Sequence, residues 1–373
     1  MAVKNKKDVG VELMRLIGCL IVICCHCVVQ YKFDDGYHWP NTFIASMWAD
    51  GVAIFWLVAG FFMFKNDNMA GKLSNFAKKR LLPALCVGVV FFYFYDFFTS
   101  NATILESMTH SAKDYGDIFL GLLKLESPFP KTGHFWYVIV YFLILLIFPA
   151  MKGFYDWMIK SPKREYIFMG ISLAFLIIND WMKNETFSFD NRSINALVPS
   201  CIFVMWGAVL YRHKDLFRGK LQLIFSIVGF FGINMLRALV IVSRNEASEI
   251  FWYTGWGLAC AICVFTFCLN IGGLMQNNAG GRVVCGIAYF TYMIYLIHYG
   301  VKDMLTYWGV KDWVRSVSPP GVPIKVLGYT LIMALLVFTL SFIIAAILHL
   351  IKVLAVNIWS RISQKGKTGE GEA

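Results

Sequence analysis

Charged residues are scarce in this chain. They make up 15% of its 373 residues, whereas apolar residues make up 58% and the mean hydropathy is +0.61. A soluble domain carries about 25% charged residues, so this composition excludes an ordinary water-soluble protein. Apolar segments of about twenty residues, the length a helix needs to cross a bilayer, recur along the chain. The sequence therefore predicts an all-α, polytopic membrane helix bundle.

Three further features are missing. The apolar segment after the basic N-terminus is too long for a removable signal peptide and lacks a small-residue cleavage site, so it is interpreted as the first spanning helix. No loop is long enough for a second folded domain. None of the ten cysteines falls in a predicted outer loop, where oxidation would favour disulfides. We therefore expect the cysteines to act as small apolar side chains, and we expect no metal site.

The hydropathy pattern predicts about ten transmembrane helices, at residues 11–31, 43–64, 82–99, 134–151, 166–183, 195–211, 221–242, 251–271, 284–307 and 325–356. An even number places both termini on one side, and Lys and Arg are more numerous in the segments of that side, which marks it as cytoplasmic. We expect one transmembrane domain over residues 1–358 and a polar, disordered cytoplasmic tail over 359–373. Between the third and fourth spans, the stretch 114–125 is expected to form a short interfacial helix.

Arg15 and His26 lie eleven residues apart in the first span, with no other charge between them. Both side chains are costly in hydrocarbon, so their presence there indicates a functional site. At about 100° per residue, eleven residues return to nearly the same helix face with a rise of about 16 Å. The two side chains are therefore expected on one face, at two depths.

A basic cluster and a single acid flank the next spans. Lys78, Lys79 and Arg80 directly precede the third span, where they act as a positive-inside signal that contacts phospholipid, or form an anion site for a phosphorylated cofactor. Asp50 is the one charge of the second span. It is either an interfacial residue at a helix start or a member of the site.

The fourth span opens with three residues at the expected outer interface, His134, Trp136 and Tyr137. An aromatic belt at the membrane surface explains Trp136 and Tyr137. The belt accounts less well for His134, which is therefore a candidate for the site.

Two more polar residues lie within later spans. Arg237 is expected to reach the outer headgroups or to pair with an acid such as Asp50 or Asp180. His298 either makes a helix-helix hydrogen bond or joins a site at the depth of His26. Cations would then lie on the inner side, suited to an anionic donor, and neutral bases on the outer side, suited to an acceptor.

Four segments together resemble the integral-membrane acyltransferase-3 family of bacterial O-acyltransferases. Arg15 and His26 match its Arg-x10-His motif, and FWLVAGFF at 55–62 is similar to its Phe-Phe-x-x-Ser-Gly-Phe segment. HFWYVIVYFLILLIFP resembles its Trp-Phe/Tyr helix, and YMIYLIH at 292–298 its Tyr-x-x-Tyr-Leu-x-His element. The chain departs from the family in lacking an Arg-x-x-Arg pair before the third span, and in having Ala59 where Ser usually stands.

The resemblance implies transfer of an acyl group from acetyl-CoA, as co-substrate and not as bound cofactor, to a cell-envelope glycan or lipid-linked sugar. It implies a multi-pass protein of the bacterial cytoplasmic (inner) membrane, embedded in the phospholipid bilayer and without a nucleic-acid partner. His26 would be the catalytic base and Arg15 a contact to the donor or transition state. The basic cluster at 78–80, together with Asp50, His134, Trp136, Arg237 and His298, would contact the substrates.

The chemistry is consistent with this assignment, because a histidine base operates near neutral pH and a cation stabilises a developing oxyanion. Three alternatives stay open. His26 either deprotonates the acceptor or first accepts the acyl group itself. The acyl group is acetyl, succinyl or another. The same buried Arg, His and Asp residues also fit a proton-coupled transporter or exporter.

Overall fold

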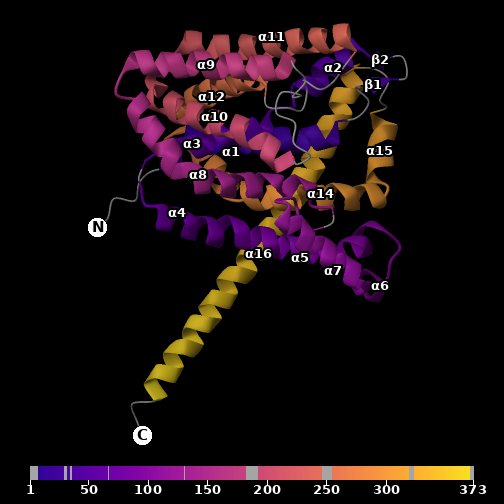
Figure 1. Cartoon of the computed structure of the whole chain (residues 1–373). Helices are drawn as coiled ribbons and strands as arrows, with labels where there is room; N and C mark the ends of the chain where they lie inside the picture. The colour runs from indigo at the N-terminus through magenta and orange to yellow at the C-terminus, as the bar shows by residue number, and fades with distance from the viewer. Residues whose placement is uncertain are drawn as a thin grey trace.

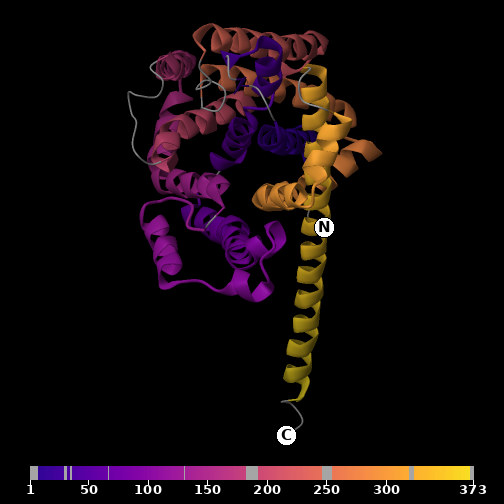
Figure 2. The same cartoon turned by 90° about the vertical axis from the view of Figure 1, so that its right-hand side faces the viewer.

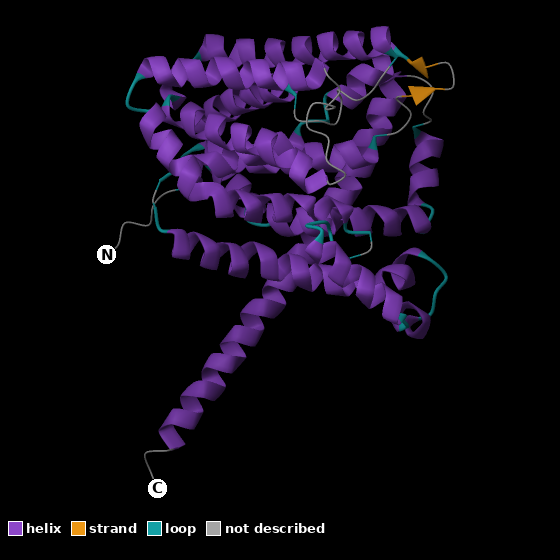
Figure 3. Ribbon diagram, in the orientation of Figure 1, coloured by secondary structure: helices purple, strands orange, loops and turns teal. Residues whose placement is uncertain are grey.

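The computed structural model describes residues 7–28, 32–33, 36–65, 67–129, 131–181, 192–245, 254–318 and 323–369. Nearly all of them are helical (Figure 3). The α-helices are α1 (Val9–Cys27), α2 (Trp39–Ser46), α3 (Gly51–Met63), α4 (Met69–Phe76), α5 (Leu82–Thr99), α6 (Ile104–Met108), α7 (Ala112–Leu123), α8 (Trp136–Met158), α9 (Pro162–Trp181), α10 (Arg192–Arg212), α11 (Lys220–Arg244), α12 (Gly255–Met275), α13 (Ala279–Ala288), α14 (Thr291–Tyr307), α15 (Val310–Val317) and α16 (Pro323–Gly369).

The other elements are short. Strands β1 (Lys32–Phe33) and β2 (Gly36–Tyr37) form one antiparallel pair, in which Lys32 lies opposite Tyr37. The π-helix η1 (Ala77–Leu81) joins α4 to α5, the 3-10 helix η2 (Gly133–Phe135) leads into α8, and the 3-10 helix η4 (Lys214–Phe217) follows α10. An all-α bundle is confirmed.

Eight helical stretches of the described chain are long and apolar enough to cross a membrane, or nine if the bent pair α13 and α14 is one span. They cover Val9–Cys27, Trp39–Met63, Met69–Thr99, Gly133–Met158, Ser193–Arg212, Lys220–Arg244, Gly255–Met275 and Pro323–Ile358. The prediction of ten is therefore not reproduced. The ninth predicted span is broken by a 59° bend, and α9, at the fifth, does not qualify; its first turn carries Lys163, Arg164 and Glu165.

The end of the last predicted segment differs as well. The helix α16 runs to Gly369, so residues 359–369 are helical where the sequence indicated a disordered tail. Extending an existing helix adds one hydrogen bond for each residue fixed, which explains why a polar segment can continue it. Residues 29–31, 182–183, 251–253 and 370–373 of the predicted segments lie outside the described part of the chain.

Helix α1 is central to the bundle. It packs against α3, α12, α13, α14 and α16, and helices α1, α3, α8, α10, α11 and α12 run in similar directions (Figure 1). The start of α1 and the end of α16 both lie to the left in Figure 1, whereas β1, β2, α6 and α15 lie to the right. In Figure 2 the last part of α16 extends away from the bundle. We call the left end, where α1 starts, the α1-start end.

Glycines allow α1 to approach its neighbours closely. A Cβ atom at Gly51 of α3 would lie 2.7 Å from the carbonyl oxygen of Gly18 in α1. A Cβ at Gly272 of α12 would lie 2.3 Å from backbone atoms of Gly10. Small residues at such crossings are the usual means of helix packing in membranes, where van der Waals contact replaces the hydrophobic driving force.

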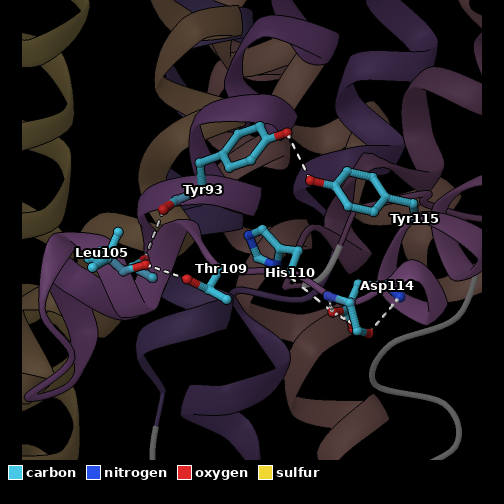
Figure 4. A network of polar contacts seen from close by, with 8 residues as sticks. Tyr93, Leu105, Thr109, His110, Asp114 and Tyr115 are labelled. Atoms are coloured by element: carbon cyan, nitrogen blue, oxygen red, sulfur yellow. Dashed lines mark hydrogen bonds and ion pairs between the residues drawn. The ribbon is translucent and has the colours of Figure 1, made fainter.

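Helices α6 and α7 lie in the chain between α5 and α8, with α7 at the predicted interfacial helix. Both begin with a capping box, Thr103 with Glu106 and Ser111 with Asp114. Backbone and hydroxyl hydrogen bonds from Ser111 hold the pKa of Asp114 below its usual range. In Figure 4 His110 lies between this cap and α5, where its ring stacks on Phe92 with centroids 3.8 Å apart. These contacts anchor the segment that leads to α8.

Candidate functional site

One cavity lined by described residues lies beside the first half of α1, near the α1-start end, and has a volume of about 460 Å³. Five cations and one carboxylate are among its lining residues, namely Lys7, Arg15, Lys72, Lys79, Arg80 and Glu12. Tyrosines from α8 and α14 complete the wall. We call it the basic cavity. Its volume lies within the usual range of small-molecule sites, and its charge suits an anionic ligand.

Arg15 is held in this cavity by its own helix. Its Nη1 lies 3.2 Å from both carboxylate oxygens of Glu12, one turn earlier on α1. The guanidinium also lies over the ring of Phe62, 5.3 Å from the centroid. Because the Arg15 side chain is 32% exposed and that of Glu12 only 8%, the guanidinium stays accessible while the carboxylate orients it.

The π-helix η1 separates the three members of the basic cluster. Lys79 and Arg80 line the basic cavity, whereas Lys78 lies outside its lining; Lys78 and Lys79 are both exposed. Arg80 packs over the ring of Tyr141, with its guanidinium carbon 4.5 Å from the centroid, and its carbonyl accepts a hydrogen bond from the Tyr292 hydroxyl at 2.7 Å. One of the two interpretations drawn from the sequence treated the three residues as a single anion site, but the structure brings only two of them to the cavity.

The second cavity, of about 580 Å³, lies further along α1. Its lining includes His26, Asp50, His134, Trp136, Tyr299 and Lys302. We call it the histidine cavity. Four of the residues proposed from the sequence thus meet in one place, although they come from α1, the start of α3, and the η2–α8 junction.

Three imidazoles form a group at this cavity. The ring of His298 lies 5.2 Å, between centroids, from the rings of both His26 and His134. The Nδ1 of His298 donates to the Tyr295 carbonyl at 2.6 Å, and the Nε2 of His134 donates to the Leu296 carbonyl at 3.0 Å. In the neutral rings the opposite nitrogens therefore carry the lone pairs. His298 Nε2 and His134 Nδ1 are buried and have no hydrogen-bond partner among the described residues.

Asp50 forms an ion pair beside the histidine cavity. Its Oδ2 lies 2.9 Å from Nη1 of Arg237, whose side chain is fully buried. Arg237 therefore pairs with an acid across the bundle instead of reaching the headgroups, and Asp50 is not a simple interfacial residue. Gly257 of α12 leaves room for the carboxylate, because a Cβ there would lie 2.8 Å from Asp50 Oδ1. The pair fixes the start of α3 against α11.

The aromatic-belt interpretation of Trp136 and Tyr137 is wrong. Their side chains are only 9% and 5% exposed. Trp136 lines the histidine cavity and Tyr137 the basic cavity, where its ring lies 4.2 Å, between centroids, from that of Trp56. Hydropathy places both residues at the start of a span, but the rotation of α8 turns them inward instead of toward lipid.

The face of α14 that carries Tyr292, Tyr295, Tyr299 and Lys302 was not among the predicted site residues, although Tyr292 and Tyr295 belong to the family-like element at 292–298. Tyr292 and Tyr295 line the basic cavity, and Tyr295, Tyr299 and Lys302 the histidine cavity. The spacing of three, four and three residues places them on one side of a helix. This periodic stripe of polar side chains within an apolar span was the signal that could have identified them.

Comparison with known proteins gives a single finding. No curated protein and no solved structure matches the chain. A family model described as an acyltransferase domain matches residues 8–348. This range includes every residue named above for the two cavities except Lys7. Since the match covers most of the chain, the protein belongs to the acyltransferase-3 family and is a polytopic membrane acyltransferase.

Proposed function

We propose that this protein transfers an acyl group, most simply acetyl, from cytoplasmic acyl-CoA to a hydroxyl of a cell-envelope glycan or lipid-linked sugar. Its site would be the bacterial cytoplasmic membrane, with both termini in the cytoplasm. The observation that carries the proposal is the pair of cavities. A basic cavity at the α1-start end and a histidine cavity beyond it meet at Tyr295, which lines both.

The basic cavity is the proposed donor site. Its cations suit the phosphates of CoA, and a guanidinium binds phosphate or carbonyl oxygens through a planar fork that Lys lacks. Arg15 and His26 are separated by about 16 Å along α1. An extended pantetheine arm bridges such a distance, which would place the phosphates near Arg15 and the thioester near His26.

The histidine cavity is the proposed reaction site. His26 would take the proton from the acceptor hydroxyl as its oxygen attacks the thioester carbonyl carbon. The carbon–sulfur bond then breaks, and the proton passes from His26 to the leaving thiolate. His134, Asp50 and Trp136 would contact the acceptor. His298 would support His26 from the buried side, since the two rings lie against each other.

The test is direct transfer in lipid vesicles. Purified protein is incubated with acetyl-CoA labelled in the acetyl group and with a panel of envelope glycans and lipid-linked sugars. The proposal predicts label in an alkali-labile ester on one acceptor. A protein that transfers no label but accumulates solute in response to a proton gradient would instead be a transporter.

A further inference from the structure

The two cavities meet at one level of the bundle. On α3 the lining changes from the histidine cavity at Ala53 to the basic cavity at Phe55. On α8 the same change falls between Trp136 and Tyr137. Among the described residues that line these cavities, Tyr295 alone is common to both. The boundary therefore crosses three helices that are distant in the sequence.

Three aromatic rings occupy this boundary. The centroids of Phe55 and Tyr137 are 6.2 Å apart, those of Phe55 and Tyr295 6.1 Å, and those of Tyr137 and Tyr295 5.7 Å. Rings at such spacings are in contact, so the three close a triangle. Tyr295 is only 3% exposed although it borders two cavities. We call these three rings the aromatic partition.

Tyr295 also connects the partition to the imidazoles. Its hydroxyl donates a hydrogen bond to the backbone carbonyl of His134. Its own backbone carbonyl accepts the bond from His298 Nδ1. The residue that closes the boundary therefore also orients the His298 ring, which lies against His26, and contacts the backbone of His134.

We propose that Tyr295 is a positioning residue that keeps the two cavities separate until a thioester-bearing arm displaces its ring from the aromatic partition. This rests on the proposed acyl transfer. If the cavities were continuous, water from the histidine cavity would reach the thioester, attack its carbonyl carbon and release free thiol and carboxylic acid. A closed partition prevents this loss by excluding water until the acyl arm passes.

Cysteine accessibility tests the partition without relying on catalysis. Cys25 lines the histidine cavity and is half-buried. The full-length protein, in vesicles of known orientation, is treated with a small, charged methanethiosulfonate from one side at a time, and modification of Cys25 is measured by mass spectrometry. In the wild type without donor, we expect modification from the histidine-cavity side only.

The variants identify the residue responsible. Tyr295→Ala should become reactive at Cys25 from the basic-cavity side too, whereas Tyr295→Phe, which keeps the ring, should not. Tyr292→Ala and Tyr299→Ala are matched controls on the same helix face, because each residue lines one cavity only. If Tyr295→Ala fails to fold, Phe55→Ala opens the same triangle from α3. The proposal is overturned if Cys25 of the wild type is modified from both sides. It is also overturned if neither Tyr295→Ala nor Phe55→Ala allows modification of Cys25 from the basic-cavity side.

Activity gives a second, separate readout. With acetyl-CoA and no acceptor, Tyr295→Ala should hydrolyse the thioester several-fold faster than the wild type, relative to its rate of transfer. A purely structural role would lower both rates together and leave their ratio unchanged, which contradicts the proposal. A wild type with a sealed partition and no transferase activity would contradict the proposed function, while the labelling result for the partition would stand.

Discussion

At the scale of single residues, the position of His26 on α1 determines its environment. It lines the histidine cavity, and the rings of His298 and Tyr299 lie 5.2 and 5.4 Å from its own, between centroids. These neighbours restrict the orientations open to the ring. A restricted imidazole that borders a cavity has the geometry required of a general base.

Replacement of His26, the proposed base, is expected to remove catalysis without removing the protein from the membrane. His26→Ala should lower the rate of acyl transfer by about 10²–10⁴-fold, the usual contribution of a general base. The measurement is transfer of labelled acetyl groups in vesicles containing equal amounts of inserted protein. His38→Ala, at an exposed histidine before α2, is the matched control. Full activity in His26→Ala would exclude His26 as the base.

The ion pair of Asp50 and Arg237 gives a second prediction at this scale. Arg237→Met leaves the carboxylate buried without its cation and should lower the free energy of unfolding by about 3–5 kcal/mol. The double variant Arg237→Met/Asp50→Leu removes both charges and should recover most of the loss. Thermal unfolding in detergent, analysed as a double-mutant cycle, measures the coupling. Equal destabilisation by the single and double variants would show that the pair itself matters little.

At the scale of elements, the π-helix η1 determines how the basic cluster is used. Consecutive residues on a helix point in different directions. In η1 this turns Lys79 and Arg80 to the basic cavity and leaves Lys78 outside its lining. A positive-inside signal would treat the three residues alike, because it depends on charge near the membrane and not on direction.

Lys78 therefore serves as a control for Lys79 within η1. If the basic cavity binds the CoA phosphates, Lys79→Gln should raise the KM for the acyl donor by about tenfold, the effect of losing about 1.5 kcal/mol from a charge-assisted contact. Lys78→Gln removes the same charge one residue earlier and should leave this KM unchanged. The KM for the acceptor should stay constant in both variants. Equal behaviour of the two variants would favour the positive-inside role.

At the scale of the whole molecule, the bundle has a polarity. The start of α1 and the end of α16 lie on the same side in Figure 1. The basic cavity is lined by residues near the start of α1, such as Glu12 and Arg15, and the histidine cavity by residues further along it, such as His26. Under the proposed function, such an arrangement would use the bilayer to keep the charged donor and the carbohydrate acceptor on separate sides. Termini on the same side require an even number of membrane crossings. The helices that would supply these crossings differ in length and hydropathy, as α9 and the bent pair α13 and α14 show.

Reporter fusions test this polarity. Green fluorescent protein fused to either end of the chain should fluoresce, because both ends are expected in the cytoplasm, where this reporter folds. Alkaline phosphatase at the same two positions should be inactive. A protein with its two ends on opposite sides would have an odd number of crossings, and the proposed sidedness of the two cavities would then be wrong.

Much of the molecule could be predicted from local sequence. Spans such as α1 and α12 were expected because twenty apolar residues in succession satisfy their own backbone hydrogen bonds in lipid. Arg15 and His26 were identified because a charge in such a span is costly. The fifth and ninth spans were less predictable. The fifth has charged residues at the start of α9, and the ninth is interrupted by the bend before α14.

The sequence by itself determined the class of the protein, its family and the helix that carries Arg15 and His26, because composition and motif spacing are local properties. Only the tertiary structure decided that Arg237 meets Asp50, 187 residues away, and that Tyr295 borders both cavities. These contacts depend on how each helix is rotated about its axis. That rotation is set by packing against neighbours distant in the chain, as where Gly51 meets Gly18, and hydropathy does not record it.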